Sequence, residues 1–231
     1  APSSTGRSKD IDLHGAYSTS QNITADSKAT GGFDLHSAEQ FGSSVSLSED
    51  SNGNARLAVG TKYGQGFNET SGQEGEVALF TFTDSVNKDF SGGALAAVIG
   101  EGYINDYSAS NANPRNDKDV NIALDSQDGF GHSVSLYYDS DLGFHRLAVA
   151  AQHDDGDNDD DTNNGAVYLY RFTDADFTGG TLQATIGKDY SGARDVDLDL
   201  PNSNSLGQIA IDGNYLALGV KGGEGGNSDD D

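Results

Sequence analysis

The chain has no cysteine, so it can form neither a disulfide framework nor a thiolate metal site or nucleophile. Basic residues are also few: 13 Lys and Arg stand against 37 Asp and Glu, which gives a formal net charge of −24. A protein that binds duplex nucleic acid needs a stripe of basic side chains to displace phosphate counterions, and these scattered cations do not form one. We therefore expect no nucleic-acid partner, and anionic membrane surfaces are disfavoured for the same reason.

Long apolar segments are missing as well. No apolar run approaches the roughly 18 residues that a membrane-spanning helix requires, so we expect no membrane span. The first five residues, APSST, lack the basic and apolar regions of a signal peptide and are typical of a mature terminus left after cleavage. Two sequons, Asn22-Ile23-Thr24 and Asn68-Glu69-Thr70, permit glycosylation.

What the chain contains is a long internal repeat. The stretch FGSSVSLSEDSNGNARLAVGTK begins at Phe41, and FGHSVSLYYDSDLGFHRLAVAAQ begins at Phe130. A second pair of similar stretches follows, GEVALFTFTDSVNKDFSGGALAAVIG from Gly75 and GAVYLYRFTDADFTGGTLQATIG from Gly165. Self-similarity of this length indicates a repeat architecture.

Each full copy contains four segments with strand-like patterns. In the first segment Val and Leu alternate with Ser, the second is a short apolar run typical of an inner strand, and a Gly pair precedes the fourth. These segments are 41–47, 56–61, 76–83 and 94–99 in the first copy, and 130–137, 146–151, 166–173 and 181–186 in the second. A third copy begins at Leu206 and shows only two segments, up to Val220. Four short antiparallel strands with Gly at the turns predict an all-β chain of β-propeller blades.

The repeat also predicts how the chain is divided. The expected parts are 1–40, a polar N-terminal segment with short strand-like stretches; 41–100, the first blade; 101–129, a long inter-blade loop; 130–187, the second blade; 188–205, a second loop; and 206–231, half of a third blade. The segment Lys9–Leu13 is similar to Lys118–Ile122 and Arg194–Leu198, which lead into repeats, so we interpret residues 1–40 as the end of an inter-blade connection. Because propellers have at least four blades, about two and a half form an incomplete ring.

Three phrases recur in the same order in the two full copies. They are Phe-Gly-x-Ser-Val-x-Leu, Arg-Leu-Ala-Val-Gly (ending in Ala in the second copy) and Gly-x-Val-x-Leu-Phe/Tyr-x-Phe. With these phrases, residues 41–220 resemble the FG-GAP repeat of integrin α-subunit propellers and of many bacterial surface proteins. The resemblance implies an extracellular or cell-surface binding and adhesion module that is not an enzyme and has a protein or carbohydrate ligand. The Ca²⁺ motif of that family is reduced here to Glu49–Asn54 and Asp139–Gly143, both shorter than the family loop.

The acidic loop of the second copy is the predicted metal site. On a propeller, four long connections are expected on one face, where ligands usually bind: 62–74, 101–129, 152–164 and 188–205. The predicted Ca²⁺ ligands carry side-chain oxygens at alternate positions of one loop: Asp155, Asp157, Asp159, Asp161 and Asn163. Such spacing lets a loop wrap Ca²⁺, which takes about six to eight oxygens. A solvated acidic loop is the alternative, because Thr162 stands where Ca²⁺ loops carry Gly.

The sequence singles out no catalytic group. The five His residues show no paired spacing, and the chain contains no Gly-x-Ser-x-Gly motif. Tyr103, Tyr107 and Tyr190 either stack on sugars or, as we favour, pack the blade edges. An alternative function is a self-assembling structural protein, a filament or ring in which a neighbouring subunit completes the open blade by β-augmentation. A hydrolase or lyase built on the propeller is a less favoured alternative.

Overall fold

A computed structural model of the chain describes residues 39–67, 72–83, 86, 90, 93–103, 118–157, 163–198, 200 and 205–222. The expected N-terminal segment, with Lys9–Leu13, lies almost entirely outside these residues. The strands in chain order are β1 (Phe41–Glu49), β2 (Ala55–Thr61), β3 (Glu76–Thr81), β4 (Ala94–Gly100), β5 (Val120–Asn121), β6 (Phe130–Asp139), β7 (Phe144–Ala151), β8 (Ala166–Arg171), β9 (Thr181–Gly187), β10 (Val196–Asp197), β11 (Ser205–Asp212) and β12 (Tyr215–Lys221). Within the described ranges, no helix is long and apolar enough to cross a membrane.

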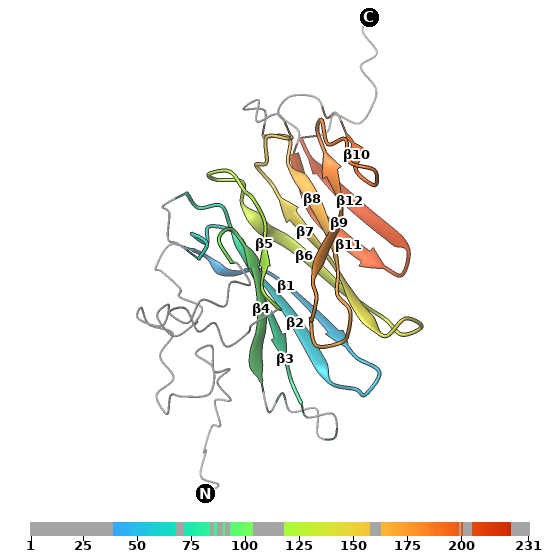
Figure 1. The fold of residues 1–231 in the computed structure, drawn as a ribbon. Helices are drawn as coiled ribbons and strands as arrows, with labels where there is room; N and C mark the ends of the chain where they lie inside the picture. The colour runs from blue at the N-terminus through green and yellow to red at the C-terminus, as the bar shows by residue number, and fades with distance from the viewer. Residues whose placement is uncertain are drawn as a thin grey trace, which may run out of the picture.

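The strands form three mostly antiparallel sheets (Figure 1). The first sheet has the order β1-β2-β3-β4-β5, the second β10-β9-β8-β7-β6, and the third β11-β12. The predicted all-β class is confirmed, and each strand segment predicted in the repeats overlaps a strand of the structure. None of the three sheets, as far as the structure describes them, closes on itself.

The first two sheets have five strands each, whereas the sequence predicted four. The additional strands are parallel: Val120 of β5 pairs with Ile99, and Val196 of β10 pairs with Ile186. The prediction of four-stranded blades was therefore wrong at their outer edge. A strand of two residues is too short to show an alternating pattern, so the sequence of the connection does not reveal it.

An aspartate explains why the two connections have similar sequences. Asp119 Oδ1 accepts a hydrogen bond from the N–H of Val98 in β4 at 2.8 Å. In the second sheet, Asp195 Oδ1 accepts one from the N–H of Thr185 in β9 at 2.7 Å. Each carboxylate thus holds the connection against the outer long strand before the chain enters the next sheet.

The Phe-Gly pair at the start of each full copy belongs to a β-bulge. The pairing of β6 with β7 shifts register between Phe130 and Ser133, and Gly131 inside the bulge has a φ of 88°. Gly42 has a φ of 86° at the same place in β1. Glycine adopts this left-handed conformation without strain. It also permits close approach, because a Cβ added to Gly60 would lie 2.0 Å from the Gly131 carbonyl oxygen.

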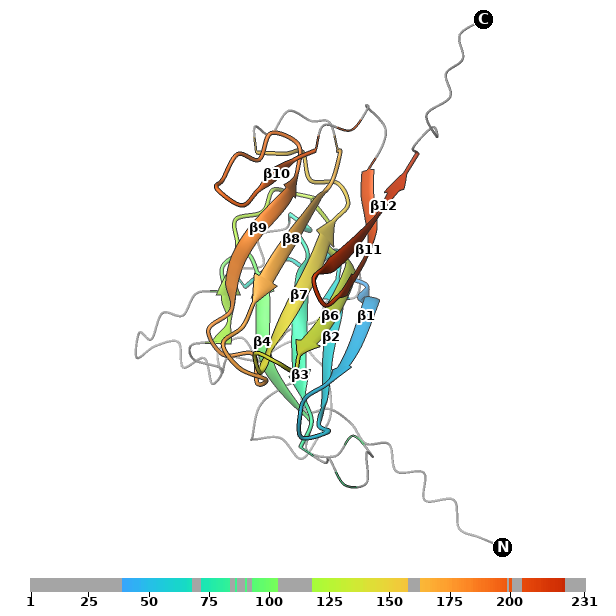
Figure 2. The same cartoon turned by 90° about the vertical axis from the view of Figure 1, so that its right-hand side faces the viewer.

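The sheets stack face to face in chain order (Figure 1, Figure 2). The N–H of Leu136 donates to Ser46 Oγ at 2.9 Å, and the N–H of Ile211 donates to Ser135 Oγ at 3.0 Å. The second and third sheets therefore dock on their predecessors through the same contact. We call the side of each sheet that faces its successor in the chain the rear face, and the opposite side the front face.

The main core lies between the rear face of the first sheet and the front face of the second. Its largest fully buried side chains are Leu79, Ile99, Phe130, Leu147, Phe172 and Phe177. A smaller cluster lies between the second and third sheets and includes Ala148, Val167 and Leu206. Removing one fully buried Phe side chain typically costs about 3–5 kcal/mol, so the interface between the first two sheets dominates stability.

Candidate functional site

The long connections meet at one edge of the sheets, which we call the loop edge. The N–H of Phe67, in the β2–β3 loop, donates to the carbonyl of Glu101 after β4 at 2.9 Å. The N–H of Asp157 donates to the carbonyl of Lys188 at 3.1 Å and joins the corresponding segments of the second sheet. The tight turns β1–β2, β6–β7 and β11–β12 lie at the opposite edge, the hairpin edge (Figure 1). This arrangement agrees with the predicted loop face.

The structure brings only part of the predicted Ca²⁺ site into view. Asp155 Oδ1 accepts the backbone N–H of Asn163 at 2.7 Å, which closes the base of the acidic loop. Asp157 is exposed beside it. Asp159 and Asp161 lie outside the described residues. Among the residues that the structure describes, no group of three His, Asp or Glu side chains is arranged to hold a metal ion.

Asp154, next to this loop, is the centre of a buried hydrogen-bond network. Its carboxylate accepts the Tyr168 hydroxyl, the Tyr190 hydroxyl at 3.2 Å and the N–H of Gly156 at 2.9 Å. Burial raises the pKa of Asp154, although these hydrogen bonds act in the opposite direction. Burial, followed by the charge of Asp154, raises the pKa of Tyr168. The network joins the loop to β8 and to the connection after β9.

The first sheet builds the same acid–tyrosine contact from a different position. The Tyr103 hydroxyl donates to Glu76 Oε2 at 2.6 Å. Glu76 begins β3, whereas the corresponding residue of β8 is Ala166. Gly64 stands where the second copy has Asp154, and a Cβ there would lie 2.5 Å from the Glu76 side chain. The carboxylate therefore occupies a similar place in both sheets. Its sequence signal is that an acid at one of two positions (64 or 76 in the first copy, 154 or 166 in the second) is matched by Gly or Ala at the other.

These contacts show whether the loop tyrosines pack the sheets or are exposed for stacking on sugars. Tyr103 is buried in the core cluster on the front face of the first sheet. Tyr190 is half-buried and packs against the main core. Both pack the sheets, which is the interpretation we favoured from the sequence. Tyr107 lies outside the described residues.

Asp128 adds a second buried carboxylate at the loop edge. Its Oδ2 accepts the N–H of Asp125 at 2.7 Å. Burial, followed by the charges of Asp154, Asp125 and Asp155, raises the pKa of Asp128 to about 7. No sequence pattern marks this residue, because a single Asp before Phe-Gly is indistinguishable from the many solvated acids. The loop edge therefore carries concentrated negative charge around a carboxyl group that titrates near neutral pH.

At the hairpin edge, an arginine neutralises the acid of the short loop Glu49–Asn54. Arg56 Nη2 donates to Asp50 Oδ2 and to Asp176 Oδ1, both at 2.7 Å. Burial alone would raise the pKa of Asp50, but hydrogen bonds from Asn54 and Asn52 and the charge of Arg56 lower it. A guanidinium supplied by the chain thus satisfies this carboxylate.

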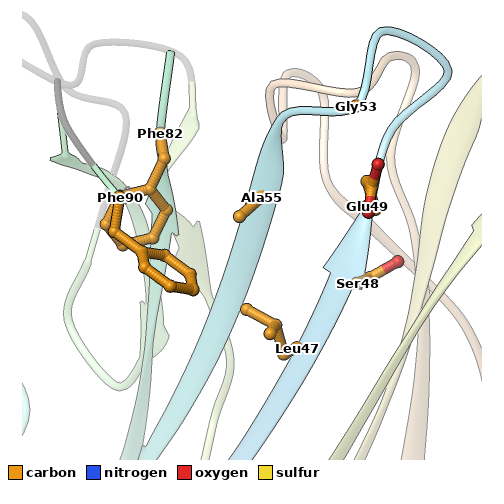
Figure 3. Close-up of a pocket in the computed structure, with 7 residues that line it drawn as sticks. All are labelled: Leu47, Ser48, Glu49, Gly53, Ala55, Phe82 and Phe90. Atoms are coloured by element: carbon orange, nitrogen blue, oxygen red, sulfur yellow. The ribbon is translucent and has the colours of Figure 1, made fainter. Parts of the chain in front are cut away.

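The hairpin edge also contains an apolar pocket of about 270 Å³ on the front face of the first sheet. Leu47 of β1 and Ala55 of β2 project beside the rings of Phe82 and Phe90 (Figure 3). Those two rings meet edge to face with centroids 5.4 Å apart. Leu47 is 58% exposed, so the pocket has a hydrophobic rim open to solvent. Its lining suits an apolar or aromatic group better than a charged one.

Comparison with known proteins adds no assignment to this geometry: no protein-family model matches the chain, and no curated protein sequence matches it significantly.

Proposed function

We propose that the chain is a non-catalytic binding and adhesion module, built from propeller-type blades and placed outside the cell or at its surface. The observation that carries the proposal is the acidic loop edge, where burial and neighbouring charges raise the pKa of Asp128 to about 7. Carboxylates held this close favour a cation, or the basic group of a partner, that offsets their repulsion. The ligand is a protein with basic groups, or a carbohydrate bound with the help of Ca²⁺.

The state of the other acids supports binding more than catalysis. Asp50 is paired with Arg56, Glu76 accepts the Tyr103 hydroxyl, and Asp154 accepts the Tyr168 hydroxyl. A general acid or nucleophile must reach a substrate, whereas these carboxylates are buried in contacts that hold the fold together. The FG-GAP phrases, which are typical of recognition scaffolds outside the cell, support the same proposal.

Ca²⁺ is the first ligand that we propose for the loop edge. The acidic loop is closed at its base by the hydrogen bond from Asn163 to Asp155, and the exposed Asp157 is free of steric cover. The sequence supplies Asp159 and Asp161 at alternate positions between them. A bound ion would rigidify the loop and offset the repulsion that Asp155 exerts on its buried neighbours.

Thermal unfolding in millimolar Ca²⁺, and then with a chelator, tests this ligand. We expect Ca²⁺ to raise the Tm of the native chain by a few degrees, because an ion that binds only the folded state stabilises it. Asp157→Asn should reduce the increase. Asp141→Asn, which removes an exposed acid from the hairpin edge, should leave it unchanged. An identical Tm with and without Ca²⁺ would count against the ion site.

Arrays of glycans and basic proteins test the partner. Binding should weaken with added salt, because salt screens charges at the surface. It should also weaken in Asp157→Asn and persist in Asp141→Asn. Absence of binding on both arrays, with Ca²⁺ present, would contradict the adhesive function.

Self-assembly by β-augmentation is the second candidate, and the third sheet favours it. Within the described residues, β12 pairs only with β11, so its other edge has no strand beside it. Open strand edges pair readily with strands from other chains. Light scattering of the purified chain separates a monomer from regular assemblies.

A further inference from the structure

The two interfaces between the sheets use different residues on their two sides. Front faces carry large apolar side chains at the first strand, such as Val134 and Leu136 in the second sheet. At the first two strands, rear faces carry small or polar residues, such as Ser133, Ser135 and Ala148. A front face therefore fits a rear face and not another front face.

At the hairpin edge, this fit depends on a residue at the start of the second strand. Arg56 lies on the rear face of the first sheet and donates through Nε to the Ala175 carbonyl of the second sheet at 2.7 Å. Its charge is close enough to His145 of the front face to lower the pKa of that ring, and His145 forms an aromatic group with Phe172 and Phe177. The two Phe rings meet edge to face at 5.2 Å, and the His145 ring lies 5.2 Å from Phe177. In this interface the chain closes a front-face aromatic group with a rear-face side chain.

The apolar pocket of the first sheet is the counterpart of that aromatic group, and no described sheet covers it. Phe82 and Phe90 meet edge to face as Phe172 and Phe177 do, at the same positions of the repeat. Ala55 precedes Arg56 as His145 precedes Arg146, so the small alanine leaves open the volume that the imidazole fills in the second sheet. Above the pocket, Val45 is 65% exposed and extends the apolar surface along β1.

The opposite end of the stack presents a rear face with a matching projection. Leu57 of β2 pairs with Leu47, and Leu216 of β12 pairs with Ile211; each partner is the last apolar residue of its strand on the front face. Arg56 and Tyr215 directly precede these leucines and are therefore counterparts on the two rear faces. Tyr215 is 82% exposed. The rest of this face is small or polar, with exposed Gln208, Ala210, Ala217 and Gly219.

We propose that two copies of the chain associate head to tail, the rear face of the third sheet of one copy docking on the front face of the first sheet of the next, with Tyr215 inserted into the pocket beside Phe82 and Phe90. The contact repeats the stacking already present twice within the chain. Between the first and second sheets the pair at this position is Arg56 and Asp176. Between two copies, Tyr215 would stand in place of the arginine and the apolar pocket in place of the aspartate, so the two surfaces would again be complementary. It uses the faces of the sheets, and it is independent of both the ligand proposed for the loop edge and pairing along the β12 edge.

The contact is heterologous, because the surfaces that meet are different. One copy keeps a free pocket and the other a free Tyr215, so further copies can add to form a ring or an open chain. Two copies would place five stacked contacts of the same kind in succession: two within each chain and one between the chains. A dimer is therefore the smallest assembly in which the stack continues from one chain into the next.

Sedimentation velocity over a range of protein concentrations tests the proposal. The native chain should associate, and Tyr215→Ser should raise the dissociation constant about tenfold or more, as expected for a buried tyrosine at the centre of an interface. Ala55→Phe should do the same from the other side, because the added ring fills the pocket. Val196→Ser, which removes an exposed apolar side chain from the outer edge of the second sheet, is the matched control and should leave association unchanged.

Mixing the two variants separates this contact from misfolding and from edge pairing. Tyr215→Ser retains an intact pocket, and Ala55→Phe retains an intact Tyr215, so each should be monomeric alone and the mixture should form a dimer of one copy of each. Growth beyond this dimer is blocked because both remaining ends are altered. A native chain that stays monomeric at every concentration would overturn the proposal. So would association that neither substitution weakens, which would instead indicate pairing along β12.

Discussion

His145 is a titratable residue buried as if it were an apolar one. It is completely buried, and neither ring nitrogen has a hydrogen-bond partner within the described part of the chain. Burial, followed by the charge of Arg56, lowers the pKa of His145 to about 4, although Asp50 and Asp174 act in the opposite direction. The ring is therefore neutral at physiological pH and packs as an aromatic residue between Tyr138 and Phe177.

This environment predicts a loss of stability in acid. The pKa of His145 is lower in the folded chain than its ordinary value of 6.5, so the unfolded chain binds the proton first and stability falls as the pH drops from 6.5 to about 4. The loss from this residue is about 3 kcal/mol. His145→Phe should remove it, so urea unfolding at pH 7 and pH 4.5 should show the variant gaining on the native chain in acid.

The contribution of Asp128 to stability changes with pH in the opposite direction and must be considered in that comparison. Its pKa is raised to about 7, so the folded chain binds this proton first and the contribution of Asp128 favours folding increasingly as the pH falls from 7 towards 4. Because His145→Phe leaves Asp128 unchanged, the difference between variant and native chain reports His145 alone. Tyr138→Phe, which changes a neighbouring ring but keeps the imidazole, should show the native pH dependence. Parallel curves for the native chain and His145→Phe would refute the assignment.

At the scale of strands and loops, the sequence predicted what alternation and repetition can report. Val45 and Leu47 alternating with Ser correctly indicated a strand. The side that contacts the next sheet is the Ser side, through Ser46 Oγ, whereas Val45 and Leu47 are 65% and 58% exposed. The same pattern could not reveal β5 or β10, because pairing along two residues depends on Asp119 and Asp195 reaching a distant strand. Contacts between loops are equally invisible to periodicity.

The candidate sites show the same limit. The spacing of acids in 152–164 predicted a cation loop but could not distinguish exposed Asp157 from buried Asp154, since burial is set by Tyr168 and Tyr190 from other elements. The pocket of the first sheet was also missed. Its Phe82 lies in a predicted strand and reads as core, and only the stacking order shows that no sheet of the described chain covers it.

The arginines of the second strands, Arg56 and Arg146, should contribute differently to stability. Arg56 is 4% exposed and pairs with Asp50, whose side chain is 1% exposed. Arg56→Ala should cost about 3–5 kcal/mol of unfolding free energy, because it leaves a buried carboxylate without its countercharge. Arg146, 24% exposed beside Asp139, makes the same kind of pair near solvent, and Arg146→Ala should cost about 1 kcal/mol. Chemical unfolding of both variants measures the difference, and equal losses would contradict the role given to burial.

At the scale of the whole molecule, the chain is a stack of sheets in which one contact is used twice. The contact is directional, and it leaves an apolar front face at the start of the stack and a rear face carrying Tyr215 at its end. The loop edge, with its acids, lies along the side of the stack and stays accessible when copies join end to end. Binding at the loop edge and association through the faces are thus separate properties of one scaffold.

Cysteine cross-linking tests the head-to-tail contact most directly, because the native chain contains no cysteine. Val45→Cys and Ala210→Cys lie exposed on the two faces that meet and leave both Tyr215 and the pocket intact. Combined in one chain and treated with a short bismaleimide, they should give a ladder of covalent multimers. Each single variant should give dimers at most. The control pair Val45→Cys and Val196→Cys, with Val196 exposed at the outer edge of the second sheet, should give no ladder. A ladder confined to the first pair is the predicted result, and equal cross-linking of both pairs, or none in either, would contradict the account.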